Sequence, residues 1–317
     1  MREDCEICGA RDPLSLNEKR RDVDAVICRY CGLVWNRLMR DAEEQVEFYK
    51  GDYRGPSVVT RKYLGSMLGR GACVMDFLGD VLKPGMRHLD IGCAEGTLLS
   101  LTRAQGLQVA GMEIDENFSR FSREVRHLDV TMATLDDAAP PEKPFDLVSF
   151  VHVVEHLFHP IETLRQAAGQ LRDGGYLFIE VPNVEKPTPG PGRFFTHVHN
   201  FYFTANTLRS LAAKAGFTPL RVGTSRRDGS VQLLARKSSL AEAGANANQP
   251  PQWRDNPARI RRFIKANRIN YYTSLRFITR KIHQKRLIKE SLQRYESLLD
   301  ELGFSEAPDQ KNAPEAP

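Results

Sequence analysis

Apolar and polar residues follow two different periods along this chain, and the change of period marks its parts. From Arg87 onward, short apolar runs typical of strands are separated by segments in which apolar residues recur every three to four positions, as in helices. The run at 145–151, FDLVSFV, is almost continuously apolar, which is typical of a strand buried on both faces. This alternation predicts an α/β fold, a doubly wound parallel sheet with helices on both faces.

Helical patterns flank this region on both sides. Apolar residues recur at helical spacing between positions 58 and 82, and Lys83-Pro84-Gly85 then ends the predicted helix. Near the other end, an apolar stripe from Tyr271 to Leu302 predicts a long amphipathic helix with room for one break. Both helical segments lie outside the alternating region, so they are expected to be additions to the α/β core.

A glycine-containing turn follows the first strand of the core. The strand His88–Ile91 runs into Gly92 and Gly96, and a helical pattern opened by Thr97 comes next. Doubly wound folds hold nucleoside cofactors with such a strand, turn and helix, because glycine lets the main chain approach the ligand and the helix start offers unpaired N–H groups. The alternative is an ordinary strand-turn-helix that binds no ligand.

Acidic residues in and around this turn indicate which cofactor it would hold. Asp90 precedes the first glycine and Glu95 lies inside the turn, so a pyrophosphate would be repelled. S-adenosylmethionine has no phosphate and carries an ammonium and a sulfonium group, which suits an acidic turn. Glu113, at the end of the next strand, is placed to accept hydrogen bonds from both ribose hydroxyls.

These motifs together resemble those of class I S-adenosylmethionine-dependent methyltransferases, of the methyltransferase-23-like family. The resemblance rests on DIGCAEG (90–96), Glu113, FDLVSFVHVVEHLFHP (145–160) and LRDGGYLFIEVPN (171–183), and it covers about residues 83 to 236. Ala94 stands where many members have glycine. The resemblance implies a Rossmann-like sheet of seven strands. The residues predicted to bind the cofactor are Asp90, Gly92, Cys93, Gly96, Glu113, Ile114, Thr134, Leu135 and Val151. Asp136 would accept the adenine amino group, unless this segment is only a solvated turn.

Two CxxC pairs near the N-terminus predict a metal site. The pairs are separated by residues 9–27, and a glycine follows each of them. This spacing matches a zinc ribbon with four thiolate ligands, a closed site whose role is structural or substrate-positioning. So short a segment has few apolar residues of its own, so the metal is expected to supply much of its folding free energy. The predicted ligands are Cys5, Cys8, Cys28 and Cys31.

The segment after the ribbon resembles one found in bacterial methyltransferases that act on sugars and other small metabolites. There an FYxxxY-like stretch helps to cover the active site. Phe48, Tyr49 and Tyr53 occupy the matching positions here. Packing against the next domain is an equally good interpretation of these aromatic residues.

Histidines near the end of the strand at 145–151 supply candidate catalytic groups. His152, Glu155 and His156 would share one face if a helix begins there, and a loop rich in Gly and Pro adds His197 and His199. Methyl transfer to a hydroxyl needs a base, and histidine is the natural base near neutral pH. The predicted catalytic residues are His199, His152, His156 and Glu155.

The same residues also resemble a metal site. The pattern HxxEH with a distant His is similar to the ExxEH-plus-His site of small-RNA 2′-O-methyltransferases, in which a divalent ion polarises the attacking hydroxyl. His152 would replace the first Glu, and the resulting site is less anionic and less suited to Mg2+. The alternative is that Glu155 and His156 cap and orient a helix while one histidine lines the pocket.

Positive charge is concentrated in the C-terminal part. Between Arg254 and Arg286 there are eleven Lys or Arg residues and one acid, Asp255. Such a helix could bind an anionic partner, namely RNA, a membrane surface, or an acidic carrier or substrate. Alternatively it is a solvated helix whose apolar stripe packs on the body or on a second copy in a homodimer.

Composition places the protein among globular cytoplasmic proteins. Of its 317 residues 41% are hydrophobic and 27% charged, no apolar run approaches the ~18 residues of a membrane span, and the N-terminus lacks a signal-peptide core. Six cysteines in a reducing compartment favour metal binding or free thiols. The predicted domains are a zinc ribbon (1–40), a connecting helical segment (41–82), a methyltransferase domain (83–237), a linker (238–257), a basic amphipathic helical extension (258–303) and a disordered tail (304–317).

The function implied by these features is O-methylation of a small hydroxylated metabolite, such as a sugar or a natural-product intermediate, with histidine as general base. One alternative is an RNA 2′-O-methyltransferase that uses the His/Glu metal site. A second is a C- or N-methyltransferase acting on a sugar nucleotide. A third is a scaffold that keeps the cofactor fold without catalysis.

Overall fold

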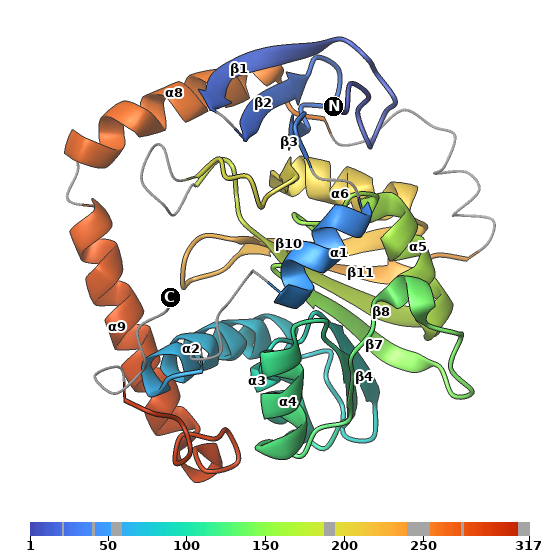
Figure 1. Ribbon diagram of the computed structural model, residues 1–317, viewed down its shortest axis with the longest axis vertical. Helices are drawn as coiled ribbons and strands as arrows, with labels where there is room; N and C mark the ends of the chain where they lie inside the picture. Colours follow the sequence, from blue (N-terminus) through green and yellow to red (C-terminus); the bar gives the residue numbers. More distant parts are fainter. Residues whose placement is uncertain are drawn as a thin grey trace. The chain divides into compact units, whose positions relative to one another are not determined.

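The computed structural model describes residues 1–20, 22–39, 42–51, 59–186, 194–239, 254–273 and 276–309 (Figure 1). The chain divides into two compact units, one made of Met1–Ala42 and Phe150–Thr279, the other of Glu43–Ser149 and Arg280–Pro317. Tyr53, most of the predicted linker, Leu275 and the end of the predicted disordered tail lie outside the described residues.

A sheet of seven strands confirms the predicted α/β fold. Its order is β10-β11-β8-β7-β4-β5-β6, and β4, β5 and β6 pair in parallel. The pairs β8/β11 and β10/β11 are antiparallel, so the sheet is mixed and departs from the parallel arrangement at this end. Residues 225–230 join β10 to β11, which is too short for a parallel crossover. The strands are β4 (Arg87–Ile91), β5 (Gln108–Met112), β6 (Val130–Thr131), β7 (Phe145–Val151), β8 (Leu171–Val181), β10 (Phe217–Thr224) and β11 (Val231–Lys237).

The first unit also contains a small sheet that includes the predicted zinc ribbon. Strands β1 (Pro13–Arg20), β2 (Val23–Cys28) and β3 (Val34–Asn36) form it together with β9 (Phe201–Tyr202), which comes from a distant part of the sequence. Its core joins ribbon residues such as Ile27 to Phe194, Phe195 and Ile260. The ribbon therefore shares an apolar core with later parts of the chain and does not depend on the metal alone.

Two helices of the first unit pack near its strands. Helix α5 (Pro160–Gln170) begins with proline at its first turn, and α6 (Ala205–Lys214) is capped by Thr204, which exchanges hydrogen bonds with Thr207 in a capping box (Figure 1). Helix α8 (Pro257–Thr273) belongs to the same unit.

Asp255 precedes α8 and connects three parts of the first unit. Its N–H donates to the carbonyl of Cys31 at 3.1 Å, and its carboxylate accepts hydrogen bonds from Thr204 and from Asn206. A Cβ at Gly32 would lie 2.8 Å from the Asp255 Cβ, so only glycine allows this approach. Although Asp255 falls within the predicted linker, its side chain is buried.

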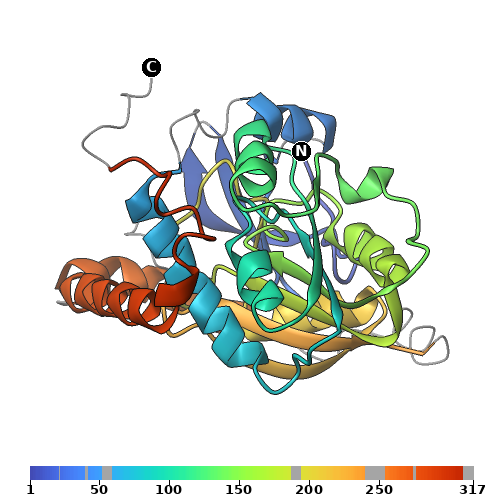
Figure 2. The same cartoon turned by 90° about the horizontal axis from the view of Figure 1, so that it is seen from below.

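The second unit contains helices α2 (Arg61–Leu78), α3 (Thr97–Arg103), α4 (Glu116–Glu124), most of α1 (Ala42–Gly51) and most of α9 (Arg276–Arg294). Gly65 and Gly69 leave a flat surface on α2 for Ile288 of α9. Arg294 binds Asp76 at 2.6 Å, and the turns after α9 run beside α2 (Figure 2).

The predicted long basic helix is thus found as two helices, α8 and α9, with residues 274–275 between them outside the described part. The apolar stripe packs on the body at Tyr295 and Leu302, both of which are buried. Ile278 and Ile282 do not follow this interpretation, because they are 42% and 62% exposed. None of the described helices has the length and apolar character to cross a membrane.

Candidate functional site

The four predicted zinc ligands converge at one point in the first unit. The Sγ atoms of Cys5 and Cys31 lie 3.4 Å apart, those of Cys8 and Cys28 3.5 Å, and those of Cys8 and Cys31 3.8 Å. Four sulfurs placed tetrahedrally at ~2.3 Å from zinc would be about 3.8 Å apart, so the cluster fits this metal closely.

Main-chain groups support this cluster as in a metal knuckle. The N–H groups of Tyr30 and Cys31 donate to the Sγ of Cys28 at 3.4 and 3.5 Å. Hydrogen bonds from Cys31 and Cys5 lower the pKa of Cys28, whereas hydrogen bonds with Cys28 and Cys5 raise the pKa of Cys31. Because the four thiols lie close together, ionisation of one thiol makes ionisation of the next less favourable. A divalent cation would offset this repulsion and allow all four to bind as thiolates.

The predicted cofactor turn adopts the tight geometry that its glycines suggested. Gly92 has φ +66° and Gly96 has φ +83°, and a Cβ at Gly96 would lie 2.3 Å from Leu128. Ala94 also has a positive φ, +49°, which costs a residue with a Cβ about 1 kcal/mol. Its main chain is held on both sides, because its N–H donates to Glu113 at 2.8 Å and its carbonyl accepts from Ser122 at 2.8 Å.

Glu113 lies at the end of β5 and braces this turn. One carboxylate oxygen accepts the Ala94 N–H, and the other accepts the Asp115 N–H at 2.8 Å. Burial raises the pKa of Glu113, although these N–H donors oppose the shift. Each oxygen keeps a second lone pair, so the side chain can still accept ribose hydroxyls.

Asp90 is held by a buried hydrogen-bond chain that the sequence interpretation missed. Ser149 of β7 donates to Asp90 at 2.5 Å and lies 2.7 Å from Nε2 of His88, whose Nδ1 lies 3.0 Å from Thr102 Oγ1. Burial lowers the pKa of His88 to about 3, so the ring is neutral. Burial also raises the pKa of Asp90 to about 7, and the charges of Glu113 and Glu95 add to the shift.

Glu95 faces its own counter-charge, which changes the charge argument for the cofactor. Arg126 is 1% exposed and approaches Glu95 at 3.7 Å, while Tyr63 donates to Glu95 at 3.0 Å. Glu95 is therefore neutralised inside the protein. Asp90 and Glu113 remain as the acidic groups of the turn, and they still favour a cationic guest over a phosphate.

The remaining predicted cofactor residues occupy varied positions. The Cys93 side chain is buried against Leu99, Leu128 and Val130, so any contact of Cys93 with a cofactor would come from its main chain. Leu135 is buried, whereas Thr134, Ile114 and Val151 are half-buried and Asp136 is exposed. Thr134 donates to Asp137 at 2.9 Å at the start of a short 3-10 turn.

His152, Glu155 and His156 do come together, but they do not lie on a helix as expected. Pro160 starts α5, and residues 152–156 form a turn with His152 at φ +57°. The His156 N–H donates to the Val153 carbonyl at 2.9 Å. Contacts distant in sequence hold the turn in place, so the local pattern could not reveal it.

Glu155, His156 and His199 form a compact cluster in the first unit, in which Glu155 is buried and both histidines are half-buried. One potential ligand atom from each lies within 4.8 Å of the others. His156 Nδ1 donates to the Val198 carbonyl at 2.7 Å, so Nε2 faces Glu155 at 3.8 Å. Nδ1 of His199 is buried without a hydrogen-bond partner among the described residues, and the Glu155 oxygens are buried with His152 Nδ1 3.2 Å from one of them. A buried carboxylate beside imidazole nitrogens is a donor set that suits a proton or a divalent cation.

The charges around this cluster set its protonation. Burial raises the pKa of Glu155, but the neighbouring rings of His156 and His152 outweigh this effect and lower the pKa to about 2. Burial lowers the pKa of His199 to about 3. Glu155 is therefore an anion and His199 a neutral ring at physiological pH.

Glu180 is a further residue of this region that the sequence interpretation missed. His152 lies between two buried carboxylates, with Nδ1 3.2 Å from Glu155 and Nε2 3.2 Å from Glu180. Gln232 donates to the other Glu180 oxygen at 2.7 Å. An acidic residue inside the apolar run FIEV was the available signal. His197, in contrast, is exposed.

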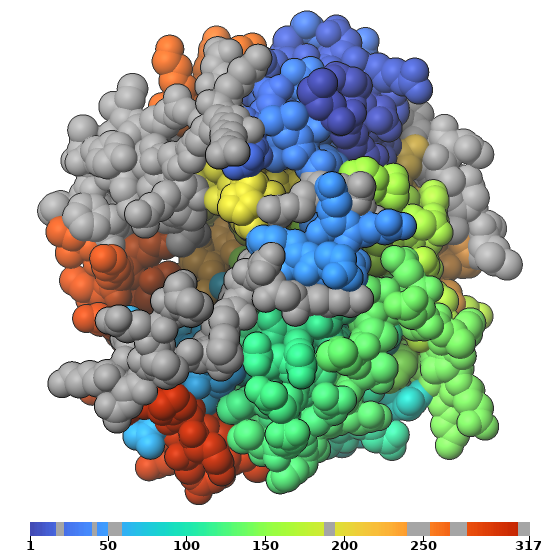
Figure 3. All heavy atoms as spheres, viewed as in Figure 1, coloured from blue at the N-terminus to red at the C-terminus, as the bar shows by residue number. Residues whose placement is uncertain are grey.

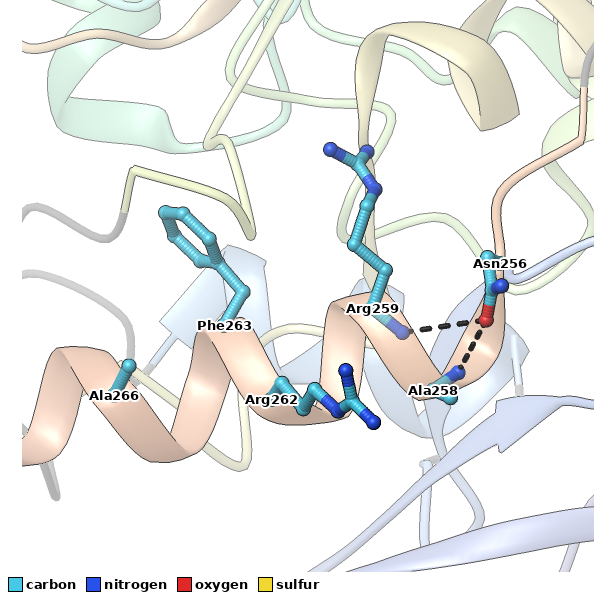
Figure 4. Close-up of a pocket in the computed structure, with 6 residues that line it drawn as sticks. All are labelled: Asn256, Ala258, Arg259, Arg262, Phe263 and Ala266. Atoms are coloured by element: carbon cyan, nitrogen blue, oxygen red, sulfur yellow. Dashed lines mark hydrogen bonds between the residues drawn. The ribbon is translucent and has the colours of Figure 1, made fainter.

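A separate pocket of about 420 Å3 lies along α8 (Figure 4). Asn256 caps the helix by accepting hydrogen bonds from the N–H groups of Ala258 and Arg259. The side chains of Arg262 and Phe263 extend from the helix. The pocket contains none of the predicted catalytic or cofactor residues. Its chemistry is basic and aromatic.

Comparison with known proteins agrees with these features. Residues 72–222 match the family model described as "Methyltransferase domain" (Methyltransf_23). A "Probable S-adenosylmethionine-dependent methyltransferase" of Mycobacterium tuberculosis is 31% identical over 134 residues, which are 41% of this chain and 47% of that protein. The ribosomal protein L11 methyltransferase of Ralstonia pickettii is 34% identical over 33% of this chain and 35% of its own length. The ubiquinone biosynthesis O-methyltransferase of Xanthomonas campestris is 30% identical over 32% and 46%. The chain thus spans about half or less of the length of these relatives.

Proposed function

We propose that residues 72–222, which match a methyltransferase domain model, bind S-adenosylmethionine, and that the protein is an O-methyltransferase that acts on a small hydroxylated metabolite. The observation that carries the choice of oxygen is the arrangement of His156 and Glu155, in which an imidazole nitrogen faces a buried carboxylate. Such a pair accepts a proton from a hydroxyl and stabilises the resulting imidazolium. A nucleophile that attacks without losing a proton would not need it.

In this proposal S-adenosylmethionine supplies the methyl group, and this chain's own residues bind and orient it. Asp90 and Glu113 present negative charge to the cationic cofactor, and Glu113 accepts its ribose hydroxyls. The turn from Gly92 to Gly96 offers main-chain groups at close range. The neutral ring of His199 makes a weak base, since burial lowers its pKa to about 3, so we assign the proton to His156 and an orienting role to His199.

A second candidate for hydroxyl activation is a divalent ion held by Glu155, His156 and His199. The supporting observation is that Glu155, His156 and His199 place potential ligand atoms within 4.8 Å of one another, and that Nδ1 of His199 is buried without a hydrogen-bond partner among the described residues. The His156 ring is also held through Nδ1 by a carbonyl, which is the usual support for a metal-binding imidazole. When bound, such an ion would lower the pKa of a coordinated hydroxyl.

We place the protein in a reducing compartment, the cytoplasm. In support, none of the six cysteines, all among the described residues, forms a disulfide, and four of them gather as candidate metal ligands. We further propose zinc as the structural metal of the Cys5, Cys8, Cys28 and Cys31 site.

The cofactor assignment is tested by calorimetry with S-adenosylmethionine. Glu113→Gln should weaken binding by about tenfold or more, because it removes charge and a ribose acceptor. Glu116→Gln, an exposed acid on α4, is the matched control and should bind as the wild type does. Equal affinity of the Glu113 variant and the wild type would refute this role.

The acceptor class is tested with isotope-labelled cofactor and a panel of sugars, sugar nucleotides, phenols and short RNAs. Label on a hydroxyl of a small metabolite supports the proposal, while label only on carbon, nitrogen or RNA overturns it. Metal analysis of a Cys5→Ser/Cys8→Ser variant separates the two modes of activation. Metal retained there and lost on Glu155→Gln would establish the second candidate.

A further inference from the structure

Asn200 lies at the meeting point of the zinc ribbon and the turn that carries Glu155 and His156. Its carbonyl accepts the N–H of Asn36 at the end of β3, at 2.9 Å, and its own N–H donates to the Glu155 carbonyl at 2.8 Å. Its side-chain amide donates to the carbonyls of His156 at 2.8 Å and Leu157 at 3.2 Å. Asn200 is 1% exposed, and each of these hydrogen bonds joins it to another group of the protein.

The strand that follows Asn200 continues this connection. In β9, Phe201 pairs with Trp35 and Tyr202 pairs with Val34. The N–H of Phe201 also donates to the Glu155 carbonyl, at 3.0 Å. In Figure 3 the segment around β9, in yellow, borders ribbon atoms, in blue. One strand therefore separates the ribbon from the turn.

The N-terminal metal loop holds the other end of the same segment. Glu6, between the ligands Cys5 and Cys8, accepts the N–H of Ile161 at 3.0 Å. Arg2 donates to the Phe158 carbonyl at 2.7 Å, and its own carbonyl accepts the Trp35 indole N–H at 3.1 Å. Residues 155–161 are thus bound at both ends by groups of the ribbon sheet.

The turn has few hydrogen bonds of its own. Only the N–H groups of His156 and Leu157 bond within it, at 2.9 and 3.4 Å. The carbonyls of Glu155, His156 and Leu157 are all bound by Asn200 or Phe201. The placement of the Glu155 and His156 side chains consequently depends on partners that are distant in sequence.

We propose that Asn200 is a positioning residue through which the metal ribbon fixes the turn of Glu155 and His156 beside His199. The zinc site then has a functional effect although it is closed to substrate. Release of the metal frees Glu6 and β3, and the turn loses its shape while the cofactor turn of the other unit does not. This inference rests on the proposed function, because it concerns the same cluster.

Hydrogen exchange and histidine spectra of the full-length zinc protein test the inference without an acceptor substrate. We compare Asn200→Ala, the isosteric Asn200→Asp, which lacks the N–H donors, and Asn206→Ala, whose amide donates to Asp255 instead of the turn. Both Asn200 variants should speed amide exchange in 155–161 roughly tenfold. They should also shift the imidazole resonances of His156 and His199 at fixed pH, while those of His88 stay unchanged. Asn206→Ala should change neither signal.

An Asn200→Asp variant that matches the wild type in both measurements overturns the inference, because the side-chain donors then have no role. Zinc removal with a chelator should reproduce the exchange pattern of Asn200→Ala. If faster amide exchange were confined to residues 1–40, the metal would not fix the turn. Calorimetry with S-adenosylmethionine keeps this result separate from the proposed function. Unchanged cofactor binding with altered exchange supports the inference, whereas loss of cofactor binding in the wild type concerns the proposed function alone.

Discussion

Asp90→Asn should make the cofactor-free protein more stable at alkaline pH while it weakens cofactor binding. Burial raises the pKa of Asp90 from 3.8 to about 7, a shift of about 3 units. At ~1.4 kcal/mol per unit, an ionised Asp90 costs the folded state about 4 kcal/mol. Asparagine keeps an oxygen for the Ser149 hydroxyl but carries no charge, so this cost disappears.

The sign of the pH dependence follows from proton linkage. Because the folded-state pKa is raised, the folded protein holds more protons than the unfolded chain between pH 3.8 and about 7, and stability falls as pH rises through that window. The Asp90→Asn variant should therefore gain stability over the wild type by about 4 kcal/mol at pH 8.5 and by less than about 2 kcal/mol at pH 5.

Urea unfolding of both proteins at a series of pH values measures this difference directly. Ser149→Ala serves as a companion variant, because its lost hydrogen bond should raise the pKa of Asp90 further and move the window upward. A stability difference between wild type and Asp90→Asn that is the same at pH 5 and pH 8.5 would refute the reasoning. Binding of the cationic cofactor should also release a proton near pH 7, which calorimetry in buffers of different ionisation enthalpy detects.

Three further predictions follow from single contacts. Cys5→Ser/Cys8→Ser should abolish bound zinc in atomic emission and lower the free energy of unfolding by several kcal/mol, since structural zinc contributes about 10 kcal/mol or more where a domain depends on it entirely. Ala94→Gly should change stability by less than about 1 kcal/mol in thermal unfolding, because the relief of backbone strain at a positive φ offsets the larger entropy of glycine in the unfolded chain. A loss above ~2 kcal/mol would show that the Ala94 methyl group makes stabilising packing contacts. Arg126→Met should destabilise by about 3 kcal/mol or more in urea unfolding, because it leaves Glu95 buried and uncompensated; an unchanged stability would refute this pairing.

Local sequence patterns predicted the parts of the site that are themselves local. The turn from Gly92 to Gly96 needs positive φ angles, and two CxxC pairs need only a metal to meet, so both could be identified from spacing. Glu113 could be placed at the end of β5 because the strand pattern fixes where that strand ends. In each case one short segment contains the physical cause.

Other parts depend on contacts that no window of sequence contains. Residues 152–156 look helical by spacing, but the helix begins only at Pro160, and the turn is hydrogen-bonded to Asn200, which lies 44 residues after His156. Arg126 cancels the charge of Glu95, which the sequence suggested would face the cofactor. The position of Ser149 beneath Asp90 required the strand order of the sheet. Buried polar residues inside apolar runs were the only warning of such partners.

Asp255 has a practical consequence for anyone who shortens this protein. A cut that removed everything from residue 254 would look harmless, as if it discarded a charged appendage. It would instead take away the acceptor of the Thr204 hydroxyl at the head of α6 and the group packed against Gly32 in the metal knuckle. The basic tail is thus anchored beside the four-cysteine cluster, and a trimmed protein should be judged by its metal content before its activity.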